Sequence, residues 1–188
     1  ILMRILITGS NGLLGQKLLH KLIGDYSTQL IATSKGDNRV SRKDGYTYFS
    51  LDITNKEEVE KAITEQLPDV VINTAAMTNV DLCEVKKEEC NALNVDGVRY
   101  LADACERIDA HLIQISTDFI FDGENGPYTE QDIPNPLSFY GLSKLKSEKL
   151  DWGLVQVDFK NSFGCDIFER WVKKIVFVDE LCIFIFLS

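Results

Sequence analysis

The sequence predicts an α/β protein with a doubly wound parallel sheet and helices on both faces. Short apolar runs alternate along the chain with segments whose apolar residues recur at helical spacing. This alternation is typical of a parallel sheet with crossover helices. Three closely spaced glycines also separate the first apolar run from the first helical segment. The length of 188 residues fits one domain with a substantial core.

Five segments are expected to be strands, because each is a short apolar run bounded by polar or turn-forming residues. Their alternation with helices predicts right-handed crossovers between parallel neighbours. The expected strands are residues 3–8, 29–34, 46–54 (a strand followed by a loop), 68–76 and 111–117.

Four segments are expected to be helical: residues 11–23, 56–67, 84–107 (one or two helices) and 137–150. Asn55 is expected to cap the second helix. A long loop with three prolines, residues 118–136, precedes the last one. The apolar faces are formed by Leu14, Leu18, Leu19 and Leu22 in residues 11–23, and by Val95, Val98, Leu101, Ala102 and Cys105 in residues 84–107.

The composition excludes several classes of partner. The chain has 20 Lys+Arg against 29 Asp+Glu, and this net charge of -9 argues against nucleic acid or an anionic membrane as the main partner. The five cysteines lack metal-binding spacing, so no metal is expected, and reduced thiols indicate a cytoplasmic protein. Met3 is the expected natural start, with no signal peptide and no membrane-spanning helix.

The three glycines lie where a dinucleotide binds in a doubly wound fold, since the N-terminus of a helix suits a pyrophosphate. Gly9 permits the sharp turn, Gly12 lets phosphate approach the backbone, and Gly15 lets the helix pack closely. A plain strand-turn-helix is the alternative, and the strand and helix on either side favour the dinucleotide site. The expected cofactor contacts are Gly9, Ser10, Asn11, Gly12, Leu13, Leu14 and Gly15.

Tyr140 and Lys144 form a YxxxK motif. On a helix the two side chains share one face. We expect the lysine ammonium to lower the pKa of the phenol from its reference value of about 10, which makes Tyr140 a proton donor or acceptor. An ordinary helix-surface pair is the alternative interpretation.

The pattern TGxxGxxG from Thr8 to Gly15, together with YxxxK, resembles the extended short-chain dehydrogenase/reductase family, which works on nucleotide sugars. PDVVINTAAMTNVDLCE, ISTDFIFDG and PYTEQDIPNPLSFYGLSKLKSE resemble in particular the dTDP-4-dehydrorhamnose reductases, over residues 3–150. The resemblance implies a Rossmann-type fold and an NAD(P)H-dependent enzyme that reduces the 4-keto group of dTDP-4-dehydro-L-rhamnose.

The resemblance also implies roles for individual residues. Thr117, with Ser116 as second choice, holds the substrate carbonyl oxygen; Tyr140 donates a proton; Lys144 tunes Tyr140 and holds the nicotinamide ribose. Further cofactor contacts are implied for Asp52, Ile53, Ala75 and Ala76, and a supporting structural role for Asn94.

The residues at the end of strand 29–34 indicate which cofactor is preferred. No carboxylate stands there to bind a ribose 2′-hydroxyl, whereas Ser34, Lys35 and Arg39 suit a 2′-phosphate. NADPH is therefore favoured over NADH, with a solvated loop as the alternative interpretation of Lys35 and Arg39.

Two other functions stay open: a nucleotide-sugar epimerase or dehydratase, and a non-catalytic regulatory subunit like that of methionine adenosyltransferase. The dTDP-sugar is the expected partner of the reductase, and a homodimer stays open as its assembly.

Residues 151–188 do not match the sixth strand and substrate domain of the family. The expected organisation is an NAD(P)-binding domain at residues 3–150 and a fragmentary remainder at 151–188, with the second domain truncated or missing. A truncated gene product, a frameshift and a sequence lacking internal segments are the open explanations, of which the last is favoured.

Overall fold

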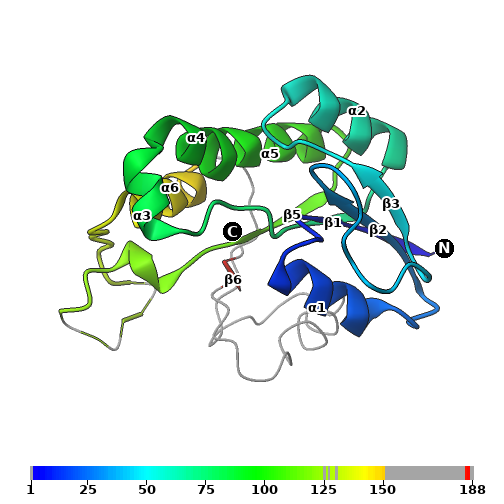
Figure 1. Cartoon of the computed structure of the whole chain (residues 1–188), viewed down its shortest axis with the longest axis horizontal. Helices are drawn as coiled ribbons and strands as arrows, with labels where there is room; N and C mark the ends of the chain where they lie inside the picture. Colours follow the sequence, from blue (N-terminus) through cyan, green and yellow to red (C-terminus); the bar gives the residue numbers. More distant parts are fainter. Residues whose placement is uncertain (1, 125, 127, 130, 151–184, 187–188) are drawn as a thin grey trace.

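The computed structural model describes residues 2–124, 126, 128–129, 131–150 and 185–186. The predictions for residues 151–184 and 187–188 lie outside this part of the chain. Figure 1 shows one sheet with helices on both of its faces, as the sequence predicts.

The sheet has the strand order β3-β2-β1-β4-β5-β6. Neighbours from β3 to β5 are parallel, and β6 pairs antiparallel with β5. The order reverses between β1 and β4, so their carboxyl ends flank the switch point where ligands bind in such sheets. The strands are β1 (Met3–Thr8), β2 (Thr28–Ser34), β3 (Thr47–Ser50), β4 (Val70–Asn73), β5 (His111–Ile115) and β6 (Ile185–Phe186).

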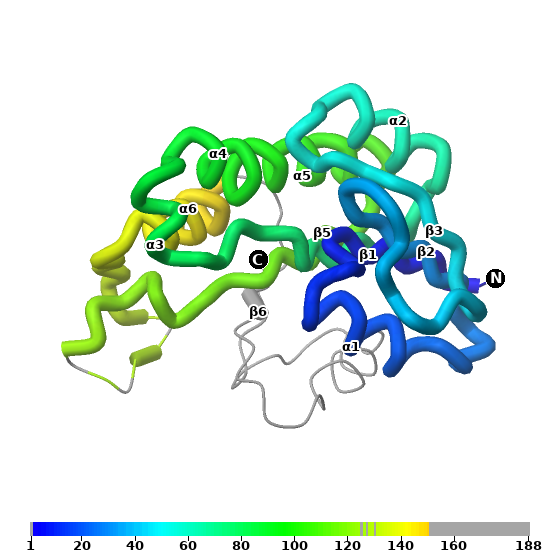
Figure 2. The backbone as a smooth tube through the Cα atoms, viewed as in Figure 1, coloured from blue at the N-terminus to red at the C-terminus, as the bar shows by residue number. Residues whose placement is uncertain are grey.

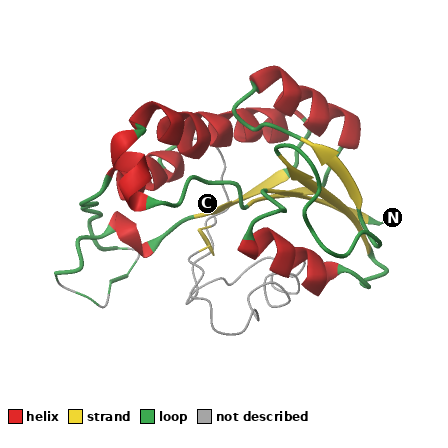
Figure 3. Ribbon diagram, in the orientation of Figure 1, coloured by secondary structure: helices red, strands yellow, loops and turns green. Residues whose placement is uncertain are grey.

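Successive residues of β1 pack on opposite faces of the sheet, as the two-residue period of a strand requires. Ile5 and Ile7 pack in the cluster that contains Leu18 and Leu19 of α1. Leu6 packs on the other face, in the cluster that includes residues of α2 and α5. Figure 3 shows α1 on one side of the strands and α2 and α5 on the other. Their bounds are α1 (Leu13–Leu22), α2 (Lys56–Gln66) and α5 (Gly97–Arg107).

A second group of helices lies beyond β5, at the end of the sheet away from β3. The tube in Figure 2 shows α3, α4 and α6 gathered there, far apart in sequence but side by side. The elements are α3 (Val80–Val85), α4 (Lys87–Asn91), a π-helical segment η1 (Ala92–Asp96), a short 3₁₀ helix η2 (Asp118–Ile120) and α6 (Phe139–Glu148).

Most predicted elements are confirmed, and several boundaries differ; β4, for example, covers Val70–Asn73 of the predicted 68–76, and β5 covers His111–Ile115 of the predicted 111–117. The third strand ends at Ser50, four residues before the predicted limit of strand and loop. The predicted one or two helices of 84–107 are instead α4, η1 and α5, preceded by α3, because Lys86 leaves helical geometry at φ -114° and ψ 56°. The last helix starts at Phe139 because Ser138 caps it and accepts a hydrogen bond from the Gly141 N–H at 3.1 Å.

Candidate active site

The glycine turn joins β1 to α1 and needs glycine at two positions. Gly9 has φ +64°, and a Cβ there would stand 2.6 Å from the backbone nitrogen of Ala75. A Cβ at Gly15 would stand 2.6 Å from the carbonyl oxygen of Gly9. The turn therefore packs backbone to backbone against the end of β4 and against the first turn of α1, as the glycine pattern predicts.

The N-terminus of α1 is suited to an anion. Gly12 is its N-cap, no side chain caps it, and its first turn holds no acidic residue. Leu13 is 68% exposed beside it. Backbone N–H groups and the positive end of the helix dipole are thus directed toward the turn, which fits a pyrophosphate.

A buried polar chain aligns the carboxyl ends of three strands at the switch point. The Thr8 hydroxyl donates to Oδ1 of Asn73, and Nδ2 of Asn73 donates to Oε1 of Gln114 at 2.7 Å. The same Oδ1 accepts the Ala75 N–H at 3.2 Å. Ala75 and Ala76, which follow this strand end, are half-buried.

Asn94 holds the segment that follows these alanines. It lies in η1, it is buried, and its amide exchanges two hydrogen bonds with the backbone of Met77, at 2.8 and 3.0 Å. Its Nδ2 also donates to the Ser143 hydroxyl of α6 at 3.0 Å. Asn94 therefore links the segment after β4 to the middle of α6, from a π-helical turn of the kind often found at functional sites.

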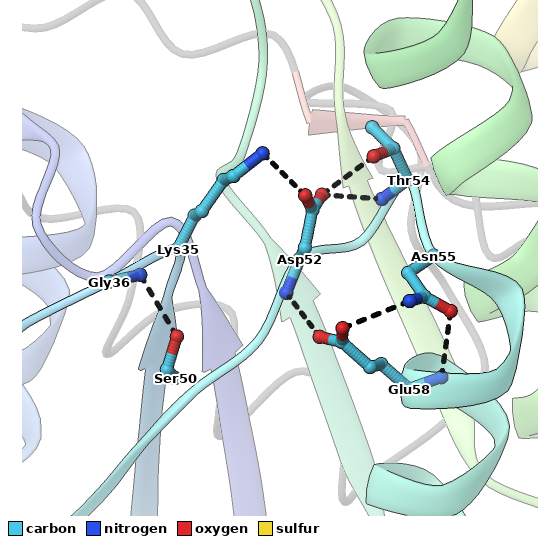
Figure 4. A network of polar contacts seen from close by, with 7 residues as sticks. All are labelled: Lys35, Gly36, Ser50, Asp52, Thr54, Asn55 and Glu58. Atoms are coloured by element: carbon cyan, nitrogen blue, oxygen red, sulfur yellow. Dashed lines mark hydrogen bonds and ion pairs between the residues drawn. The ribbon is translucent and has the colours of Figure 1, made fainter.

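The adenosine side of the predicted site lies at the ends of β2 and β3. Figure 4 shows Lys35 pointing to Asp52, where the Nζ to carboxylate distance is 2.5 Å. Asp52 also accepts from the backbone and side chain of Thr54, at 3.0 and 2.7 Å. Ile53 is buried beneath Gly97. Ser34 is buried and accepts the Asn11 N–H at 3.1 Å, while Arg39 is exposed.

The structure brings Thr117 and Tyr140 together. Burial raises the pKa of the Tyr140 phenol above its ordinary value, and a hydrogen bond from the Thr117 side chain acts in the opposite direction. Phe119 packs edge-on against the Tyr140 ring at 5.9 Å between centroids. The Thr117 hydroxyl donates to Oδ1 of Asp118 at 3.2 Å. The phenol and this hydroxyl thus both lie just beyond the carboxyl end of β5, where they can bind one carbonyl oxygen.

The predicted effect of Lys144 on Tyr140 is wrong in this structure. Lys144 is 2% exposed, its Nζ donates to the Ile115 carbonyl at 2.5 Å, and the pKa of Tyr140 is raised rather than lowered. Burial lowers the pKa of the ammonium to about 8, and the charge of Glu148 partly opposes this. The motif places both residues on α6, but the end of β5 determines where the lysine head lies.

Ser116, the second choice for the substrate contact, hydrogen-bonds the Glu148 carboxylate. Burial raises the pKa of Glu148, while the bond to Ser116 and the charge of Lys144 lower it. Because Ser116 is buried whereas Thr117 is half-buried, Thr117 is the more accessible of the two hydroxyls.

Sequence reasoning missed two residues that shape this edge. A Cβ at Gly141 would overlap the carbonyl oxygen of Phe119, so glycine lets the first turn of α6 lie directly on η2 and brings Tyr140 to Thr117. Glu84 accepts the Phe139 N–H at 2.5 Å and holds the start of α6. A glycine inside a helical segment is itself a signal of close backbone approach, whereas the contact of Glu84 has no local signature.

The fold and the site define a dinucleotide-binding α/β protein of the extended short-chain dehydrogenase/reductase type. The chain belongs to the family described as RmlD substrate binding domain, whose model matches residues 3–152. This confirms the family resemblance. Among the described residues, no helix is long and apolar enough to cross a membrane, and no group of three potential metal ligands occurs.

Three similar proteins illustrate the membership. The dTDP-4-dehydrorhamnose reductase of Aggregatibacter actinomycetemcomitans is 38% identical over 148 residues, which is 78% of this chain and 46% of the relative. Methionine adenosyltransferase 2 subunit beta of Rattus norvegicus is 36% identical over 146 residues, 78% of this chain and 42% of the relative. A crystal structure of dTDP-4-dehydrorhamnose reductase from Bacillus anthracis in complex with NADP superposes with a TM-score of 0.67 at 32% identity, over 79% of this chain and 48% of that one. The chain thus spans less than half the length of these relatives.

Proposed function

We propose that the chain is the cofactor-binding and proton-donating part of a nucleotide-sugar ketoreductase, which reduces the 4-keto group of dTDP-4-dehydro-L-rhamnose with NADPH. The observation that carries this proposal is that the ring of Tyr140 packs edge-on against Phe119 of η2, which places the phenol next to Thr117 at the end of β5. The glycine turn and the 32% identity to a reductase described with NADP support the cofactor. The 38% identity to a dTDP-4-dehydrorhamnose reductase supports the reaction.

The residues present fit a dinucleotide. The turn from Gly9 to Gly15 would hold the pyrophosphate at the N-terminus of α1, since no side chain occupies that helix end. Asp52 and Ile53 would contact the adenosine portion, and Ala75 and Ala76 would lie along the dinucleotide. The bound nicotinamide supplies the hydride, and the protein supplies orientation and a proton.

In this proposal Thr117 and Tyr140 both hydrogen-bond the substrate carbonyl oxygen, and Tyr140 delivers the proton as that oxygen gains negative charge. The raised pKa of the phenol keeps it protonated near neutral pH, as a proton donor requires. Lys144 would hold the nicotinamide ribose, as the resemblance implies. Its ammonium now lies on the Ile115 carbonyl, close to the strand end where the substrate would bind.

We also propose the division of the chain into an NAD(P)-binding domain at residues 3–150 and a remainder of the substrate domain at 151–188. The match of the family model to residues 3–152 supports the first boundary. Most of the contacts that choose the sugar nucleotide would then come from outside residues 3–150.

The test is the consumption of NADPH with dTDP-4-keto-6-deoxy-L-sugar, followed by the absorbance of the reduced nicotinamide. We expect wild-type protein to consume NADPH, Tyr140→Phe to lose turnover, and Leu142→Ala, an exposed residue of the same helix, to retain it. Turnover that persists in Tyr140→Phe, or a wild-type chain that does not bind NADPH, would reject the proposal.

The 36% identity to methionine adenosyltransferase 2 subunit beta supports a second candidate, a non-catalytic regulatory subunit. Such a subunit would keep the nucleotide site and would bind a partner enzyme. Retained NADPH binding, absent turnover and a stable complex with a methionine adenosyltransferase catalytic subunit would favour it over the reductase.

A further inference from the structure

Two charged side chains of α6 are held by neighbouring residues at the end of β5. The Lys144 ammonium donates to the Ile115 carbonyl at 2.5 Å, and the Ser116 hydroxyl donates to Oε1 of Glu148. Lys144 and Glu148 are four residues apart on the helix, so their side chains share one face. The strand end therefore positions both charged heads, although the YxxxK motif includes only the lysine.

This pair of charges lies largely away from water. Lys144 is 2% exposed, Ser116 is buried and Glu148 is half-buried. A buried ammonium loses its hydration and releases its proton more easily, unless an opposite charge lies nearby. Burial lowers the pKa of the Lys144 ammonium to about 8, and the charge of Glu148 is the strongest influence in the opposite direction.

The other titratable groups that act on the pair have smaller effects. The Cys90 thiol of α4 also raises the pKa of Lys144, but less than Glu148 does. The charge of Lys149, just beyond α6, lowers the pKa of Glu148 less than the bond from Ser116 and the charge of Lys144 do. In the part of the chain that the structure describes, Glu148 is thus the carboxylate that most strongly favours a charged Lys144.

We propose that Glu148 is a positioning residue of the candidate active site, which keeps the buried Lys144 ammonium charged at the end of β5 while Ser116 holds its carboxylate there. The inference rests on the proposed function, in which Lys144 would hold the nicotinamide ribose. A charged lysine is a stronger donor to ribose hydroxyl groups than a neutral one. Tyr140, Lys144 and Glu148 follow one another at four-residue intervals, so the functional face of α6 extends one turn beyond the motif.

The first measurement follows the protonation of Lys144 by NMR of isotope-labelled lysine side chains, with Lys144→Met to assign the signal. Glu148→Gln keeps an acceptor for Ser116 but removes the charge, so we expect it to lower the proton affinity of Lys144 about tenfold. Ser116→Ala keeps the charge but releases the carboxylate, so it should lower the proton affinity by a smaller factor. Glu88→Gln, the matched control, removes an exposed carboxylate from α4 and should leave the proton affinity within about twofold of the wild-type value.

The second measurement compares the affinities of the full chain for NADP and 2′,5′-ADP by calorimetry. The second probe lacks the nicotinamide ribose, so the affinity ratio reports the half of the cofactor that Lys144 would hold. A tenfold lower proton affinity leaves about threefold less charged Lys144 at pH 7.5, so Glu148→Gln should lower the ratio about threefold there. At pH 6 Lys144 is charged in both proteins, and the ratio should return to the wild-type value.

The outcomes separate this inference from the proposed function. An unchanged proton affinity of Lys144 in folded Glu148→Gln overturns the role of Glu148, and so does an affinity ratio lowered equally at both pH values, which would indicate a purely structural effect. An unchanged proton affinity in Ser116→Ala overturns the role of Ser116. Near-UV circular dichroism checks folding; if Glu148→Gln does not fold, Ser116→Ala decides. Failure of both probes to bind overturns the proposed function, whereas the titration of Lys144 still decides whether Glu148 holds its charge.

Discussion

Two regions of the molecule are built in different ways: the glycine turn, Gly9 to Gly15, and the Tyr140 edge, where the first turn of α6 lies on η2 just beyond β5. The turn is one short segment whose glycines let backbone meet backbone, both within the segment and at Ala75 after β4. The Tyr140 edge is made by contacts across long sequence separations, such as Lys144 with the Ile115 carbonyl. The comparison teaches that a motif can determine a local backbone while leaving the direction of its functional side chains to tertiary contacts.

The largest effect is expected for Gly9→Ala. The substitution places a Cβ at φ +64° and 2.6 Å from the backbone of Ala75, so the turn or the end of β4 must move. We expect a loss of about 3 kcal/mol in the free energy of unfolding from strain and overpacking, together with loss of nucleotide binding. Urea denaturation and calorimetry measure the two effects. Gly24→Ala is the control, because φ is also positive there but no atom lies within 4 Å of the added Cβ.

The same comparison explains how much the sequence predicts. Gly9, Gly12 and Gly15 predict the turn, and the apolar runs predict where the strands lie along the chain, because both signals are local in the sequence. The head of Lys144 could not be placed, since its acceptor belongs to β5, 29 residues away. Glu84, which holds the start of α6, is 55 residues from its donor.

Gly141→Ala should break the Tyr140 edge and spare the turn. The added methyl group overlaps the Phe119 carbonyl, so α6 must move away from η2 and carry Tyr140 from Thr117. We expect a cost of about 1–3 kcal/mol in stability and a large loss of turnover, with unchanged 5′-AMP affinity. A parallel loss of 5′-AMP binding would show that the two regions are not independent.

Lys144→Met tests the buried ammonium through pH. The pKa of Lys144 is about 8 when folded, below its ordinary value of 10.5. Between these values the unfolded chain binds the extra proton, so the stability of wild-type protein relative to Lys144→Met should rise with pH, by up to about 1.4 kcal/mol per pH unit. The difference between the two proteins cancels the opposite effect of Cys83 and Cys105, whose pKa values burial raises to about 12. Denaturation at pH 7.5 and 9.5 provides the comparison, and a constant difference would contradict the burial of a charged head.

The smallest effect is expected for Asn55→Ala. Asn55 caps α2 and accepts the Glu58 N–H at 3.2 Å. Its loss should cost about 1 kcal/mol and leave turnover unchanged, because the Glu58 N–H that it caps lies outside the Tyr140 edge. Asn79→Ala removes a similar cap from α3, which packs on α6, and should reduce turnover at a similar cost in stability. Equal turnover in both variants would show that α3 does not support the Tyr140 edge.

The most direct measurement is a crystal structure of the chain with NADP. The account predicts the pyrophosphate within hydrogen-bonding distance of the backbone N–H groups at the N-terminus of α1, and the nicotinamide beside the phenol of Tyr140. A dinucleotide bound away from the glycine turn, or a nicotinamide with Tyr140 beyond reach, would contradict it.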